Sequence, residues 1–191
     1  MTKNRLEAFS DGVIAIIITI MVLEMKFPAT SDVQALKPQI PLFLSYILSF
    51  VHVGIYWNNH HHLLHLAEKV NGKVLWANLH LLFWLSLTPL VAAWMGNNYL
   101  APWPVAFYGI ILLMSALAYH ILVQCLVQLQ GQRSLLAKAI ADDTKGRLSN
   151  LIYVIAIPLA FVETWLSFIC FVSVSAMWLI PDRRIEKVLV E

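Results

Sequence analysis

The chain has 191 residues, of which 60% are hydrophobic and only 13% are charged. Soluble domains have about half apolar and about a quarter charged residues, so this composition excludes an ordinary soluble domain. It also excludes a disordered chain, which needs low hydrophobicity and high charge. The net charge of +2 gives no indication of a nucleic-acid partner. A mean hydropathy of +0.72 indicates a membrane protein instead.

Long uncharged stretches indicate where the chain crosses the membrane. No Asp, Glu, Lys or Arg occurs between Lys37 and Glu68, or between Lys73 and Arg133. A spanning helix needs about 20 mostly apolar residues, so the first stretch holds one span and the second holds two. We therefore predict an all-α, six-helix transmembrane bundle that forms a single domain over residues 1–191. The predicted spans lie near residues 4–26, 39–63, 74–95, 102–126, 148–162 and 165–180.

Turn and breaker residues separate the later spans. Gly96-Asn97-Asn98 and Pro102-Trp103-Pro104 divide the third span from the fourth. The mixed-charge stretch from Arg133 to Arg147 predicts a loop with room for a short surface helix. Glu163-Thr164 joins the last two apolar runs, and Pro181-Asp182-Arg183-Arg184 ends the second of them.

The distribution of basic residues predicts the orientation in the membrane. With both termini cytoplasmic, all of the 13 Lys and Arg residues except Lys26 and Lys37 fall on the inner side. Positive residues are enriched on the cytoplasmic side of membrane proteins, so the sequence predicts cytoplasmic termini.

A cleaved signal peptide is an alternative interpretation of the start of the chain. The apolar run Val13–Leu23 follows Lys3 and Arg5, as in a signal peptide. Glu7 and Asp11 disfavour this interpretation, because such a region lacks acidic residues. A first spanning helix is the better interpretation.

Six residues of the predicted first helix recur at steps of four and three. This set, which we call the first-helix stripe, comprises Arg5, Phe9, Gly12, Ile16, Thr19 and Leu23. Such spacing places all six on one helix face, where copies of one helix can meet. One hypothesis is that the stripe lines a pore, with apolar rings from Ile16 and Leu23 and a hydroxyl ring from Thr19. The other is an ordinary buried helix with an interfacial Asp11 near Arg5.

Histidines cluster at the inner end of the predicted second helix. His61 and His65 are four residues apart and share a helix face, a spacing that can hold zinc. No Cys or carboxylate accompanies them in the sequence, so the alternative is that they hydrogen-bond to other helices or face water. Ser10, Asp11 and Asn78 are expected at the same membrane depth. A hydrogen-bonded cluster of these groups satisfies their polar atoms.

Several motifs resemble the transmembrane protein 175 family of potassium channels. The most specific is Arg5-x-x-x-Phe9-Ser10-Asp11 at the start of the first span, and the similarity covers nearly the whole chain. The supporting motifs are Tyr56-Trp57-x-x-His60-His61, Leu75-Trp76-x-Asn78 and Ile180-Pro181-Asp182-Arg183-Arg184. The chain also lacks the Thr-Val-Gly-Tyr-Gly filter of ordinary potassium channels, as family members do.

The resemblance implies roles for particular residues. Ile16 corresponds to the isoleucine constriction of the family, and Leu23 to a further apolar ring; Ile20 is grouped with these gate residues. Thr19 corresponds to the hydroxyl layer that contributes selectivity. A structural polar network near the cytoplasmic side is expected to comprise Arg5, Phe9, Ser10, Asp11, Trp76, Asn78 and either His60 or His61.

The resemblance also implies how the chain works. It is expected to conduct potassium passively through a central pore lined by first helices. The pore would form in a homotetramer in the lipid bilayer of a prokaryotic inner (plasma) membrane, with K⁺ as permeant species and no cofactor or metal. The alternative is a membrane metal transporter or metalloenzyme built on the histidines. No nucleophile–base pair or phosphate loop is apparent, so we do not predict an enzyme.

Overall fold

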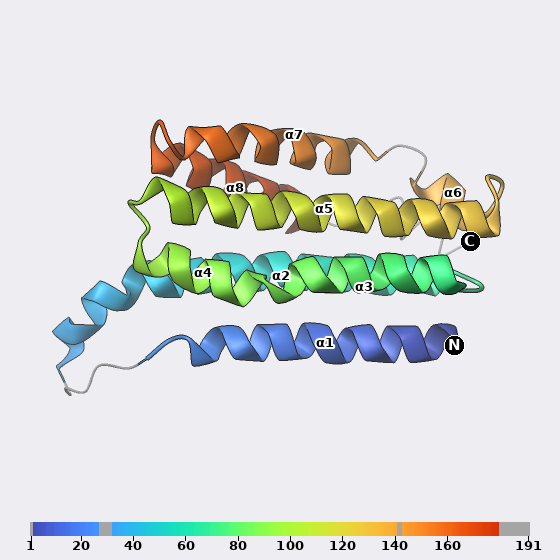
Figure 1. Ribbon diagram of the computed structural model, residues 1–191, viewed down its shortest axis with the longest axis horizontal. Helices are drawn as coiled ribbons and strands as arrows, with labels where there is room; N and C mark the ends of the chain where they lie inside the picture. Colours follow the sequence, from blue (N-terminus) through green and yellow to red (C-terminus); the bar gives the residue numbers. More distant parts are fainter. Residues whose placement is uncertain (1, 27–31, 141–142, 180–191) are drawn as a thin grey trace.

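The computed structural model describes residues 2–26, 32–140 and 143–179, and every regular element in these ranges is a helix (Figure 1). The elements are α1 (Lys3–Leu23), the 3₁₀-helix η1 (Val33–Gln39), α2 (Ile40–Leu66), α3 (Gly72–Ser86), α4 (Thr88–Asn97), α5 (Pro102–Gln130), α6 (Leu135–Ile140), α7 (Thr144–Leu159) and α8 (Thr164–Leu179).

Four helical segments are long and apolar enough to cross a membrane. They are Lys3–Leu23, Val33–Leu66, Gly72–Asn97 and Pro102–Gln130, and each overlaps one of the first four predicted spans. The helices α7 and α8 have 16 residues each. At 1.5 Å per residue each is about 24 Å long, somewhat less than the ~30 Å hydrocarbon core. The last predicted span reaches residue 180, which lies outside the described residues together with the motif at 181–184.

The third predicted span, 74–95, is not one continuous helix. It divides at Leu87 into α3 and α4. At this point the Leu87 amide donates a hydrogen bond to the Trp84 carbonyl, three residues earlier, at 3.2 Å. Pro89 explains the break, because a proline has no N–H and its ring clashes with the carbonyl four residues earlier. The two helices still follow one another across the same layer (Figure 1). The sequence contained this signal, but the span prediction did not use it.

The polar connections match their predicted positions. α4 ends at Asn97 and α5 begins at Pro102, as the two breaker motifs predict. The mixed-charge loop carries the short helix α6. Gly131, directly after α5, has φ of +92°, a conformation that favours glycine.

The helix α1 lies at one edge of the bundle, with α7 at the opposite edge (Figure 1). It packs mainly against α2, α3 and α4, while α5 joins these helices to α7 and α8. Two apolar cores result, one between α1, α2, α3 and α5 and the other between α4, α5, α7 and α8. One side of α1 therefore has no neighbouring helix within the described chain.

Close packing of α2 on α4 depends on Gly96. A Cβ atom at this position would lie 2.7 Å from the Leu42 Cα atom, closer than real contacts allow. We expect Gly96→Ala to lower the free energy of unfolding by about 1–3 kcal/mol, because the helices must separate. Thermal unfolding in detergent measures this, with Gly54→Ala as the control, since a Cβ at Gly54 meets nothing within 4 Å. Equal melting temperatures for the two variants would contradict the prediction.

Candidate functional site

The helix α1 has one buried and one exposed face. Every member of the first-helix stripe is exposed, and the side chains of Ile16 and Leu23 are 57% and 74% exposed. The opposite face is buried in the bundle and consists of Leu6, Ser10, Ile14, Ile17 and Met21. The two sets alternate along the helix because its 3.6-residue period separates them. The first-helix stripe thus forms the unpartnered side of a helix at the edge of the bundle.

Thr19 presents an oxygen atom on this exposed face. Its hydroxyl lies 2.9 Å from the Ile16 carbonyl and 3.1 Å from the Ala15 carbonyl, and donates to the backbone of its own helix. A hydroxyl has one proton and two lone pairs, so an oxygen whose proton is engaged in this way can still accept from water or contact a cation. Ile16 and the 42% exposed Ile20 offer only hydrocarbon at neighbouring positions.

A buried chain of hydrogen bonds ties α1 to α2 and α3. Ser10 Oγ donates to the Leu6 carbonyl at 2.8 Å and accepts from Asn78 Nδ2 at 2.9 Å. Asn78 Oδ1 then accepts from His60 Nε2 at 2.7 Å. Ser10 uses its single proton on the backbone, so it can only accept from Asn78, which must therefore present its NH₂ group to Ser10. The Asn78 oxygen then faces His60, and His60 must carry a proton on Nε2 to donate to it. His60, Asn78 and Ser10 are completely buried.

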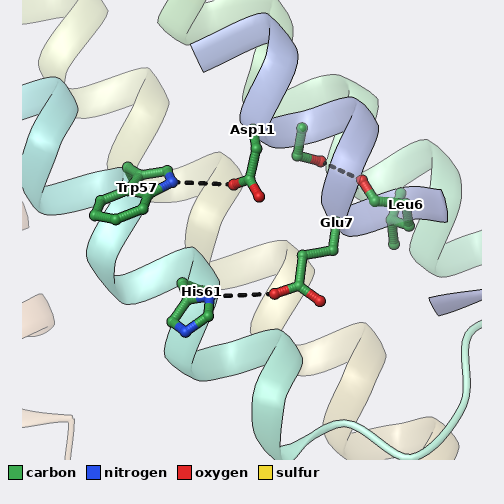
Figure 2. Close-up of polar contacts among 6 residues, drawn as sticks. Leu6, Glu7, Asp11, Trp57 and His61 are labelled. Atoms are coloured by element: carbon green, nitrogen blue, oxygen red, sulfur yellow. Dashed lines mark hydrogen bonds and ion pairs between the residues drawn. The ribbon is translucent and has the colours of Figure 1, made fainter. Parts of the chain in front are cut away.

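A second set of polar contacts joins α1 and α2 near the surface. Trp57 Nε1 donates to Asp11 Oδ1 at 3.0 Å, and His61 Nδ1 lies 3.1 Å from Glu7 Oε1. Figure 2 shows these two contacts one helical turn apart, each from α2 to α1. Because the two helices are antiparallel, residues four apart on each helix meet in reverse order. The rings of Trp57 and His61 also stack, with centroids 6.2 Å apart.

The structure therefore divides the polar network expected from the sequence. It brings Ser10, Asn78 and His60 together in the buried chain, and it places Asp11 and His61 in the surface contacts. The remaining members, Arg5, Phe9 and Trp76, are exposed, and Trp76 is 75% exposed.

The carboxylate of Asp11 is held by a hydrogen bond from α2. The described residues show no ion pair between Arg5 and Asp11, and the indole of Trp57 bonds the carboxylate instead. Sequence reasoning missed the roles of Glu7 and Trp57. The available signal was the matching four-residue spacing of Glu7 and Asp11 on one helix and of Trp57 and His61 on the other.

The histidines do not assemble a metal site in the part of the chain that the structure describes. No group of three or more His, Cys, Asp and Glu side chains there is arranged to hold a metal ion. The rings of His61 and His65 stack at a centroid distance of 6.3 Å, and Glu7 is the carboxylate beside His61.

Comparison with known proteins places this geometry in a family. A family model described as endosomal/lysosomal potassium channel TMEM175 matches residues 5–89. A Chryseobacterium protein named potassium channel is 54% identical over the full length of both chains. The chain belongs to the TMEM175 family of potassium channels. This confirms the family predicted from the sequence motifs, and with it a family of channels rather than enzymes.

Further TMEM175 relatives support the assignment. A Streptomyces collinus protein named potassium channel is 30% identical, with 84% of each chain covered. The crystal structure of a lysosomal potassium-selective channel TMEM175 homolog from Chamaesiphon minutus has a TM-score of 0.81 at 26% identity. That match covers 93% of this chain and 96% of the other, so the bundle has the fold of this TMEM175 homolog over the matched length.

The buried chain is expected to stabilise the subunit. Asn78→Leu leaves the His60 Nε2 proton without an acceptor and removes the donor to Ser10. Each unpaired buried group costs about 1–3 kcal/mol, so the melting temperature should fall clearly. The control is Asn97→Leu, because Asn97 is exposed and bonds only the Ala93 carbonyl of its own helix. Thermal unfolding of purified protein compares the two, and a similar small effect for both would contradict a stabilising role.

Proposed function

We propose that this chain forms a passive, potassium-selective channel in which copies of α1 surround a central pore. The observation that carries the proposal is the exposed first-helix stripe on a helix at the edge of the bundle. A lipid-facing helix is expected to expose apolar side chains, whereas this face also exposes the Thr19 hydroxyl. The Chryseobacterium and Streptomyces collinus relatives are both named potassium channel, which supports the same conclusion.

The pore requires several copies of the chain. A single α1 cannot enclose a pathway, and the rest of the bundle lies on the other side of this helix. Closed cyclic symmetry places the same face of each copy on one axis. We propose a homotetramer with α1 innermost, as the similarity to single-repeat family members implies.

Two kinds of exposed side chain on α1 have different roles in the proposed pore. Rings of Ile16, Ile20 and Leu23 have no oxygen to replace the water around an ion, so they act as a gate by closing or dewetting the pore. A ring of Thr19 oxygens can contact a partly dehydrated cation, and we assign selectivity to it. Arg5, Asp11 and the buried chain then serve to hold α1 in place. The mechanism uses no cofactor, and K⁺ is the permeant species.

We propose six membrane passes with both ends of the described chain on the cytoplasmic side. α7 and α8 supply the last two passes as an antiparallel hairpin (Figure 1). The start of α1 lies at the same end of the bundle as the loop between α2 and α3 (Figure 1). Lys69 belongs to this loop and Lys73 to the first turn of α3, whereas Lys26 follows α1 and Lys37 belongs to η1. The positive-inside rule favours this orientation in a prokaryotic inner membrane.

Two measurements test the proposal. Purified protein in liposomes should release potassium down its gradient, whereas protein-free liposomes should not. In a background lacking Cys125 and Cys170, Thr19→Cys should form disulfide-linked dimers under oxidation, because the positions face a common axis. Ile14→Cys is the matched control, since Ile14 is buried within its own subunit and should not cross-link. Absence of potassium release would refute the channel, and cross-linking at Ile14 alone would refute the pore face.

A further inference from the structure

A second polar site lies inside the subunit, away from the first-helix stripe. It is a cavity of about 50 Å³ between α2, α5, α7 and α8, and no residue of α1 lines it. Its walls include the rings of Tyr56, Tyr119, Tyr153 and Trp178. The polar side chains Asp143 and Asn150 complete them. A partly enclosed space with aromatic walls and few polar groups is typical of a small-molecule site.

Hydrogen bonds fix the walls of this cavity. His52 is a buried member of the lining, with Nε2 at 2.7 Å from the Tyr153 hydroxyl and Nδ1 at 3.0 Å from Ser175 Oγ. Trp178 Nε1 donates to Ser149 Oγ at 2.9 Å. These contacts connect α2, α7 and α8. The side chains that fix the shape of the cavity therefore already have hydrogen-bond partners.

One buried acceptor of the cavity remains for a ligand. Asn150 Oδ1 is buried and has no hydrogen-bond partner among the described residues. Leaving such a group unpaired costs about 1–3 kcal/mol, which predicts an occupant that donates to it. Asp143 adds a carboxylate: Oδ1 accepts from the Gly146 amide at 3.0 Å, and Oδ2 is 3.9 Å from His120 Nδ1, beyond hydrogen-bond distance.

We infer that this cavity binds a small ammonium-type monovalent cation. The N–H groups of such a cation would donate to Asn150 Oδ1, and the Asp143 carboxylate would balance its charge. Aromatic residues also line the cavity, and the face of an aromatic ring attracts positive charge. Lys145 Nζ lies 5.8 Å from the centre of the Trp178 ring, so this indole already contacts one ammonium group of the chain. The volume limits the ligand to a few heavy atoms. The inference does not depend on the pore proposal.

The probe that tests this site is methylammonium chloride, titrated calorimetrically into purified full-length protein in sodium chloride. We expect saturable binding with one site per chain. Asn150→Leu should weaken it at least tenfold, because the acceptor is lost. Asn150→Asp should strengthen it, because a carboxylate replaces a neutral amide of the same shape. A merely structural role for Asn150 does not predict tighter binding.

Controls separate this cavity from the pore and from loss of folding. Thr19→Val, on α1, should leave methylammonium binding unchanged. Trp178→Phe should retain more affinity for methylammonium than Trp178→Leu, because only the phenyl ring keeps a π face. If Asn150→Leu does not fold, this comparison tests whether methylammonium binds in the cavity. Absence of saturable binding would overturn the inference. So would binding that Thr19→Val abolishes, or binding that neither Asn150 variant changes.

Discussion

Replacing Ile16 with asparagine is expected to raise the potassium current severalfold. In the proposed tetramer this side chain forms an apolar ring on the axis, and an apolar ring of this kind restricts ions by excluding water. An amide of similar length keeps water in the constriction. The subunit should still fold, because the Ile16 side chain is 57% exposed. Currents across planar bilayers that contain purified protein measure the effect.

The control for Ile16→Asn is Val22→Asn. Val22 is also exposed on α1 but lies outside the first-helix stripe, so its asparagine variant should not raise the current. An equal increase for both variants would indicate a general loosening of α1 rather than an open constriction. No change for Ile16→Asn would place the constriction elsewhere.

Replacing Thr19 with valine is expected to reduce the preference for potassium over sodium. Valine keeps the branched shape but removes the oxygen that the exposed face offers to a cation. The measurement is the reversal potential with potassium on one side of the bilayer and sodium on the other. Each tenfold loss in the permeability ratio of potassium to sodium shifts the reversal potential by about 59 mV for a monovalent ion. We expect the shift to be toward zero.

Thr19→Ser is the matched control, because it retains the hydroxyl and should retain most of the selectivity. If Thr19→Val left the reversal potential unchanged while Ile16→Asn shifted it strongly, the gate and selectivity layers would be assigned in the wrong order. If neither variant changed current or reversal potential, this face of α1 would not line the pore.

Periodicity and charge were sufficient to predict much of the fold. The uncharged stretches located α2, α3–α4 and α5, because a membrane span needs a minimum length of apolar sequence that little else produces. The steps of four and three along α1 also identified a single face, and the structure leaves that face exposed. Pro89 was visible in the sequence, but helix breaks within a span become certain only when the backbone hydrogen bonds are known.

Side-chain partners depended on the tertiary structure. The sequence could not distinguish His60 from His61, because adjacent residues on a helix differ by about 100° in direction and only the packing of α2 decides which direction is inward. The structure turns His60 to Asn78 in the interior and His61 to Glu7 near the surface. The packing of α2 also directs Trp57 toward α1, where its indole donates to Asp11.

The sequence by itself therefore determined the membrane class, the family motifs and the stripe on α1, because each of these is a repeat or spacing along one chain segment. The tertiary structure alone decided which residues from different helices meet. The chain His60–Asn78–Ser10 and the cavity beside Asn150 each join residues far apart in sequence. Local spacing carries no information about such contacts, since they depend on how the helices pack and rotate against one another.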